Sequence, residues 1–238
     1  LDFSKAHHFI IGYDYFITSN LRMKIEPYYQ YLYNIPVIDN GTWSMINYEQ
    51  EFTFDKVLVN EGTGTNIGID FTLERFLQNN YYYLVTASFF DAKYTGGNGN
   101  TYNSRFNKNY VFTILGGKEF VFDKKPEKTR ILSVNGRISL MGGHRIVPVH
   151  EELSNQLEDI YYDWSNPYEE QNPTDFFLDL TISYRINKKK QSSIWTLQVK
   201  NLTQTPSNYM YQYNIKEGKI ENTSQAIMVP SISYKIEF

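Results

Sequence analysis

Residues 228–238 read MVPSISYKIEF, and the stretch alternates between two kinds of side chain. Successive side chains of a β-strand point to opposite sides, so the even-numbered and the odd-numbered residues would lie on different faces. The mostly apolar face would carry Met228, Pro230, Ile232, Tyr234, Ile236 and Phe238, and the more polar face Val229, Ser231, Ser233, Lys235 and Glu237. Alternation over this length predicts an amphipathic strand.

Eight further stretches alternate in the same way. They are residues 7–18, 21–33, 63–76, 81–93, 109–122, 129–142, 174–187 and 192–202. The chain is therefore predicted to be all-β, with nine strands of about 10–14 residues each, whereas strands of globular proteins usually have about 5–6 residues. Strands of this length are typical of the wall of a transmembrane antiparallel up-and-down β-barrel rather than of a soluble β-sandwich.

The alternation also predicts which side chains share a face. The residues expected to point to lipid include Ile67, Ile69, Phe71, Leu178, Leu180, Ile182, Ile232, Tyr234 and Ile236. Those expected to point to the lumen include Asp70, Thr72, Asp179, Thr181, Ser231, Ser233 and Lys235. A shift of one residue in any strand would exchange the two sets.

The composition supports β structure and excludes several classes of protein. The chain has 21 Tyr, 16 Phe and 3 Trp but only four Ala, and aromatic residues favour strands whereas alanine favours helices. Cysteine is absent, which excludes disulfides, Cys-zinc sites and Cys nucleophiles. The net charge of −3 predicts no nucleic-acid partner. No apolar run approaches the ~18 residues of a membrane helix, although barrel strands lack such runs as well.

The connections between the predicted strands alternate between short and long. The short turns are residues 19–20, 77–80, 123–128 and 187–191, and the long loops are residues 34–62, 94–108, 143–173 and 203–225. In an up-and-down barrel all short turns then lie at one rim and all long loops at the other, as in outer-membrane barrels.

The longest loop, residues 143–173, has features of its own. Val149, Leu153, Leu157 and Ile160 have helical spacing, which predicts a short surface helix near residues 150–158. An aromatic cluster of Tyr161, Tyr162 and Trp164 follows this helix. Aromatic rings in a loop can stack on a ligand or pack inside the loop, and the sequence leaves both alternatives open.

Several motifs resemble the late barrel strands of TonB-dependent outer-membrane receptors. They are YNSRFNKNYVF (102–112), LGGKEF (115–120), MGGHR (141–145), DFFLDL (175–180), SYRIN (183–187) and VKNL (199–202). The pattern of Tyr234, Ile236 and Phe238 resembles the terminal signal that the barrel-assembly machinery reads. On this resemblance, residues 1–238 are the C-terminal part of the receptor's β-barrel, and the plug domain and remaining strands are absent from the sequence.

The resemblance implies the function, the partners and the location. The family has a 22-stranded barrel around an N-terminal plug and sits in the outer membrane of Gram-negative bacteria. It imports a scarce, large solute such as a siderophore, cobalamin, a glycan or a peptide, and the TonB complex supplies the energy through the plug. Implied partners are therefore the TonB complex, the barrel-assembly machinery, outer-membrane lipid and lipopolysaccharide, and a possible surface lipoprotein.

Ligand contacts are expected at the long-loop rim. The candidate ligand-binding residues are His144, Arg145, Tyr161, Tyr162 and Trp164. No catalytic residue, metal site or cofactor is predicted, because the sequence has no nucleophile elbow, triad signature or spaced set of metal ligands. The protein is accordingly predicted not to be an enzyme. A passive channel or porin is the main alternative, followed by a barrel enzyme, an adhesin and a soluble β-sandwich.

Overall fold

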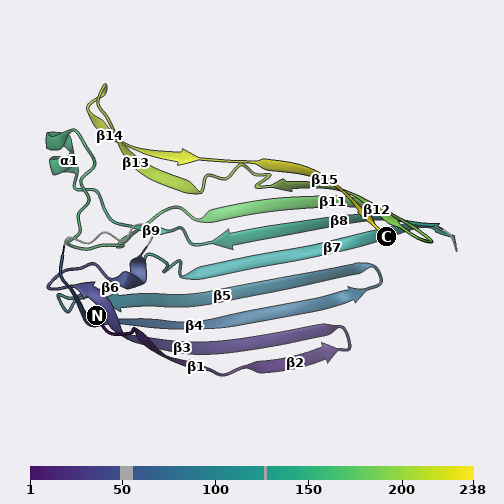
Figure 1. Cartoon of the computed structure of the whole chain (residues 1–238), viewed down its shortest axis with the longest axis horizontal. Coiled ribbons are helices and arrows are strands. Elements are labelled where there is room, and N and C mark those ends of the chain that lie inside the picture. Colours follow the sequence, from purple (N-terminus) through teal and green to yellow (C-terminus); the bar gives the residue numbers. More distant parts are fainter. Residues whose placement is uncertain (49–55, 126–127) are drawn as a thin grey trace.

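The computed structural model describes residues 1–48, 56–125 and 128–238, and its main feature is one large antiparallel sheet (Figure 1). Along the sheet the order is β1, β3, β4, β5, β7, β8, β11, β12 and β15, while β2 also pairs with β3 and the short β6 with β5. The strands along this order are β1 (Lys5–Ile10), β3 (Leu21–Ile38), β4 (Leu58–Gln78), β5 (Tyr81–Thr95), β7 (Tyr110–Lys125), β8 (Lys128–Met141), β11 (Asp175–Lys188), β12 (Ser192–Lys200) and β15 (Val229–Glu237). The additional strands are β2 (Tyr13–Thr18) and β6 (Thr101–Asn103).

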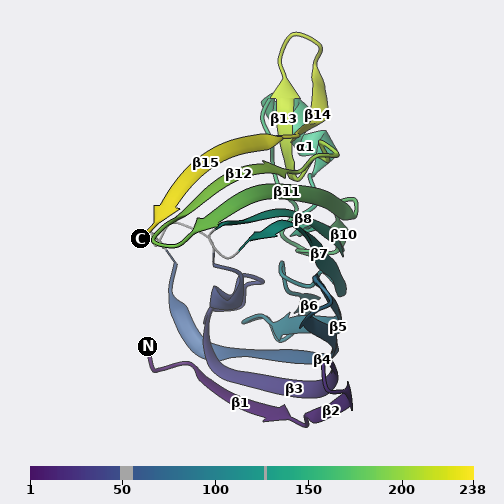
Figure 2. The ribbon, with the colours of Figure 1, turned by 90° about the vertical axis from the view of Figure 1, so that its right-hand side faces the viewer.

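The all-β prediction and its nine strand positions are confirmed. The predicted strand at residues 7–18 is split into β1 and β2, which pair one after the other with β3 and so share a single position. Across the break, the backbone N–H of Ile11 donates to the carbonyl of Pro27 at 3.1 Å and continues the ladder. The sheet is curved but not closed, and β1 and β15 lie at its two edges (Figure 2).

Strand pairing places side chains of the same kind in rows across the sheet. One row holds Met23, Leu73, Val85, Ile114, Ile138 and Leu178. The next holds Lys24, Thr72, Thr86, Thr113 and Ser139 and points to the opposite face. The register therefore gives the sheet one apolar and one polar face, as the alternation predicts.

The polar face is the concave one. Tyr28, Asn66 and Asp70 line a pocket together with Ile46 of the 3-10 helix η1 (Met45–Asn47), and Figure 2 shows η1 inside the curve of the sheet. On the convex face, the side chains of Ile67 and Ile232 are 56% and 79% exposed. The described part of the chain thus leaves the apolar face of the sheet in contact with its surroundings.

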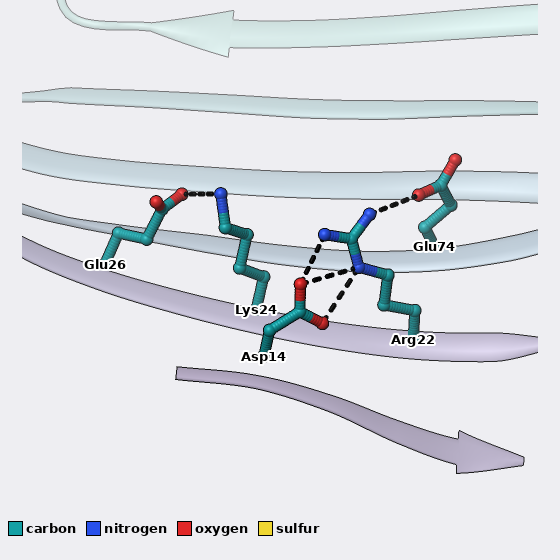
Figure 3. Close-up of polar contacts among 5 residues, drawn as sticks. All are labelled: Asp14, Arg22, Lys24, Glu26 and Glu74. Atoms are coloured by element: carbon teal, nitrogen blue, oxygen red, sulfur yellow. Dashed lines mark hydrogen bonds and ion pairs between the residues drawn. The ribbon is translucent and has the colours of Figure 1, made fainter. Parts of the chain in front are cut away.

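The concave face also carries a charged network at its N-terminal edge (Figure 3). Arg22 binds the carboxylate of Asp14 through Nε, at 2.9 and 3.1 Å, and through Nη2. Its other terminal nitrogen lies 3.8 Å from Glu74, and Lys24 pairs with Glu26 at 2.7 Å. The three carboxylates and two cations of this network largely compensate one another, with Arg22 shared between Asp14 and Glu74.

The loops lie as the lengths of the connections predict, with one difference. Figure 1 shows the tight turns at one end of the sheet and the long segments at the other. The segment 203–225, predicted as a loop, instead forms a hairpin of β13 (Asn208–Asn214) and β14 (Lys219–Gln225) that stands away from the sheet (Figure 2). In the predicted turn 123–128, residues 126 and 127 lie outside the described residues.

The best-buried apolar side chains lie at the long-loop end of the sheet, on the ends of β3 and β5, in β6 and in loop 143–173. Tyr94, at the end of β5, is 1% exposed and packs on Tyr102 of β6 and on Tyr168, with ring centroids 5.6 and 6.3 Å apart. Ile46 and Val147 complete this cluster. The loops are therefore held together by a small hydrophobic core of their own, which positions the site described next.

Candidate ligand-binding site

The motif at residues 102–112 folds into a loop that is held by side-chain hydrogen bonds, beside the core of Tyr94, Tyr102 and Tyr168. Asn107 is fully buried, and its carboxamide donates to Asp91 at 2.7 Å and to Asn103 at 3.0 Å. Ser104 donates to the side-chain oxygen of Asn47 at 3.1 Å, and this bond joins the loop to η1. Buried polar groups are costly unless paired, so these contacts fix the loop in one conformation.

The two glycines of the motif MGGHR allow neighbouring loops to approach closely. A Cβ atom on Gly142 would lie 1.8 Å from the carbonyl oxygen of Lys108, and one on Gly143 would lie 2.0 Å from that of Asn172. The short strand β9 (Arg145–Ile146) begins directly afterwards and pairs with β10 (Glu170–Gln171), closing the base of loop 143–173.

Arg145, a predicted ligand residue, links loop 143–173 to the loop at residues 102–112. Its Nε donates to the carbonyl of Asn107 at 3.0 Å and its Nη2 to the side-chain oxygen of Asn109 at 3.1 Å. Its Nη1 donates to the carbonyls of Tyr168 and Glu169 at 3.3 and 3.0 Å. Loss of solvent lowers the pKa of Arg145, and the charge of Asp91 opposes this effect. Most of its hydrogen-bonding capacity thus stabilises the loops.

His144, the second predicted ligand residue of that motif, lies apart from the aromatic cluster. His144 is at the surface, and its backbone carbonyl accepts a hydrogen bond from the N–H of Asn172 at 2.9 Å. Partial desolvation lowers the pKa of His144, and the positive charge of Lys108 lowers it further. The ring lies outside both loop pockets described below.

The predicted helix near residues 150–158 is confirmed as α1 (Glu151–Leu157). Nδ1 of His150 accepts the N–H of Leu153 at 3.3 Å and caps the N-terminus of the helix. The fully buried hydroxyl of Ser154 accepts the N–H of Tyr161 at 2.8 Å. The aromatic segment is therefore folded back against the helix, and the longest loop is ordered.

The predicted aromatic cluster divides between two pockets. Tyr162 and Trp164 line a pocket of about 300 Å³ that also includes Arg145, which we call the rim pocket. Tyr161 lines a different pocket with Trp43 of the first long loop, and Trp164 borders both. The structure therefore brings together three of the five predicted residues, namely Arg145, Tyr162 and Trp164, in the rim pocket. Tyr161 meets only Trp164, in the neighbouring pocket, and His144 lines neither pocket.

The rim pocket also contains residues that sequence analysis missed. One wall consists of Tyr209, Met210 and Tyr211 of β13, and the remaining lining residues are Arg105, Ile146, Val147, Tyr168 and Asn172. Burial is the main cause that raises the pKa of Tyr211, and nearby Glu170 and Tyr162 raise it further. The spacing of Tyr209, Tyr211 and Tyr213 was the available signal, because alternate tyrosines indicate a strand with an aromatic face.

The predicted assembly-signal residues lie at the edge strand β15. Tyr234 packs against Trp195 of β12 with ring centroids 4.3 Å apart, and Ile236 is 43% exposed on the same face. Phe238 is 97% exposed. Recognition by the assembly machinery stays a prediction.

Outside these pockets, the described residues offer few groups that could hold a metal ion. No group of three or more His, Asp or Glu side chains in ranges 1–48, 56–125 and 128–238 is placed to hold a metal ion. His7 stacks on Tyr33 at 5.2 Å, whereas His8 meets the edge of Tyr28 at 6.3 Å, so these two histidines pack separately. No helix among the described residues is long and apolar enough to cross a membrane.

Comparison of the chain with protein-family models, with curated proteins and with solved structures finds no match.

Proposed function

We propose that this chain forms part of the barrel wall and the extracellular loops of a TonB-dependent outer-membrane receptor, which imports a scarce, large solute. The observation that carries the proposal is the two-sided sheet: a single curved layer with an apolar convex face, a charged concave face and packed loops at one end. The motifs at residues 102–145 and 175–202 add the resemblance to this receptor family.

The exposed convex face argues against a soluble sandwich. A sandwich buries the apolar face of each sheet against a second sheet about 10 Å away. Here Ile67 and Ile114 on inner strands and Ile232 on the edge strand β15 remain half to mostly exposed. In a membrane the same side chains would contact lipid, and the tyrosines and phenylalanines near the strand ends would lie at the interfaces.

In this proposal the described chain does no bond chemistry. The sheet would enclose the solute path on its concave side, and the long loops would capture the solute on the outside. The plug and its TonB contact would belong to other parts of the protein. A passive channel would share the two-sided sheet and the charged concave face. The two functions therefore differ in whether uptake requires energy, which has to be measured.

The test is uptake by cells that produce the intact protein and by a matched deletion strain. Four labelled solutes would be compared, namely a ferric siderophore, cobalamin, an oligosaccharide and a peptide, each with and without a protonophore. We expect uptake of one solute to disappear both in the deletion strain and after the protonophore is added. Uptake that depends on the protein but persists with the protonophore would favour a passive channel. Fractionation that places the protein in the soluble pool would reject both.

A further inference from the structure

The rim pocket combines aromatic rings with polar groups that make no hydrogen bond within the described residues. Tyr162 and Trp164 from loop 143–173 and Tyr209 and Tyr211 from β13 supply rings. The hydroxyls of Tyr162, Tyr209 and Tyr211 and the carboxamide of Asn172 make no hydrogen bond to any residue in the described ranges. The pocket therefore offers both stacking surfaces and free donors and acceptors.

The charges around the pocket favour a neutral ligand. Two lining residues, Arg105 and Arg145, are cationic and none is acidic, but the guanidinium of Arg105 lies over the ring of Phe106 and that of Arg145 donates to four oxygens at 3.0 to 3.3 Å with the charge of Asp91 nearby. Glu170, opposite Ile146 in the β9–β10 pair, lies near Tyr211 and supplies a negative charge close to the pocket. The groups that remain for a ligand are thus mainly phenol hydroxyls and an amide, which do not select for a charged molecule.

We propose that the rim pocket binds a neutral sugar ring, with Tyr162, Trp164, Tyr209 and Tyr211 stacking on its C–H face and Asn172 binding its hydroxyls. A flat aromatic ligand would satisfy the rings but leave the polar groups desolvated and unpaired, which is costly. A pyranose has an apolar face and a rim of hydroxyls, and it satisfies both. This inference rests on the proposed function in taking the long-loop end as the side that meets the solute.

The size of the pocket limits what it can hold. About 300 Å³ is at the lower end of the range for small-molecule sites, so one or two sugar rings of a larger solute would fit. Because the hairpin supplies one wall and loop 143–173 the other, the site exists only when these two segments are packed together.

The inference can be tested by ligand-observed NMR on the intact protein in a detergent without a sugar head group. The probes are the methyl glycosides of glucose, galactose and mannose, N-acetylglucosamine, benzoate as a planar anion, and glycylglycine. We expect at least one sugar to bind saturably, with an affinity lowered about tenfold or more by Tyr211→Leu and by Tyr162→Leu, since each removes a stacking ring. Tyr161→Leu is the matched control, because Tyr161 lines the neighbouring pocket, and it should change the affinity less than about twofold.

Two further variants keep the test decisive if a leucine variant does not fold. Tyr211→Phe retains the ring and should weaken binding less than Tyr211→Leu, and Asn172→Ala should weaken binding of the sugar with the rings intact. Saturable binding of benzoate or glycylglycine without any sugar would overturn the inference, as would sugar binding that is unchanged in all four pocket variants. Failure of every sugar to bind would also overturn it, and protonophore-sensitive uptake of a solute without sugar would leave the proposed function standing.

Discussion

The carboxamide of Asn201 donates a hydrogen bond to the carbonyl of Ile227, 3.1 Å away, and so joins the two ends of the segment that carries the β13–β14 hairpin. The same amide donates to the carbonyl of Thr205 at 3.0 Å, and its oxygen accepts the N–H of Thr205 at 2.9 Å. The backbone N–H of Asn201 donates to Asp179 on the concave face at 2.9 Å. One residue therefore links both ends of the hairpin segment to each other and to β11.

Replacing Asn201 should loosen the hairpin. Asn201 has a φ of 51°, a left-handed conformation that asparagine adopts more readily than alanine. Asn201→Ala should lower the local stability by about 2–3 kcal/mol through lost hydrogen bonds and backbone strain, seen as faster hydrogen exchange of the amides in residues 208–225. Asn222→Ala on the exposed surface of β14 is the control. Equal exchange in the two variants would show that Asn201 does not hold the hairpin.

The two faces of the sheet should respond differently to a charge. Ile114 is 50% exposed on the convex face, and its neighbour Thr113 lies on the concave face. In a bilayer Ile114→Lys should destabilise the protein by about 2–4 kcal/mol if the residue is near the midplane, while Thr113→Lys should cost much less. Urea unfolding in lipid vesicles, followed by heat-modifiable migration, measures both. A larger effect at Thr113 would mean that the faces are assigned the wrong way round.

Close backbone packing at Gly143 should make this position intolerant of any side chain. A Cβ atom there would lie 2.0 Å from the carbonyl oxygen of Asn172, which cannot move without shifting the loop. Gly143→Ala should therefore destabilise loop 143–173 by roughly 1–3 kcal/mol, measured as faster limited proteolysis within the loop. Gly136→Ala is the matched control, since its nearest atom, the carbonyl oxygen of Asp179, would be 4.0 Å away. Unchanged proteolysis of Gly143→Ala would contradict the close approach.

The order of loop 143–173 should depend on pH through His144. Its pKa in the folded protein lies below the ordinary value of 6.5, because partial desolvation and Lys108 disfavour the charged ring. Between the lowered pKa of the folded state and 6.5, an opened loop therefore binds a proton that the folded loop does not. The loop should be most stable above this pH and lose stability as the pH falls towards the pKa of the folded state. Hydrogen exchange of the loop at pH 7.5 and 5.5 tests this prediction. His144→Gln should reduce the difference in exchange between the two pH values. If the difference is unchanged in this variant, groups other than His144 cause it.

The sequence alone determined the strands, the two faces and the order of short and long connections. These follow from local rules, because side chains alternate along each strand and pairing with either neighbour preserves the alternation. Ile232 and Ser233 could thus be assigned to opposite faces without knowing their partners. The helix at residues 151–157 was predictable for the same reason, since its spacing is local.

Only the tertiary structure decided which loop residues share a site. Tyr162 and Tyr211 are far apart in sequence, and they line one pocket because the β13–β14 hairpin packs beside loop 143–173. Arg145 looked like a ligand residue, but the carbonyls of Asn107, Tyr168 and Glu169 occupy most of its donors. Such contacts join segments that no periodic pattern relates, and they depend on close approaches such as that of Gly143 to Asn172. The pattern of one strand constrains its own faces, whereas a pocket between loops depends on how separate segments pack.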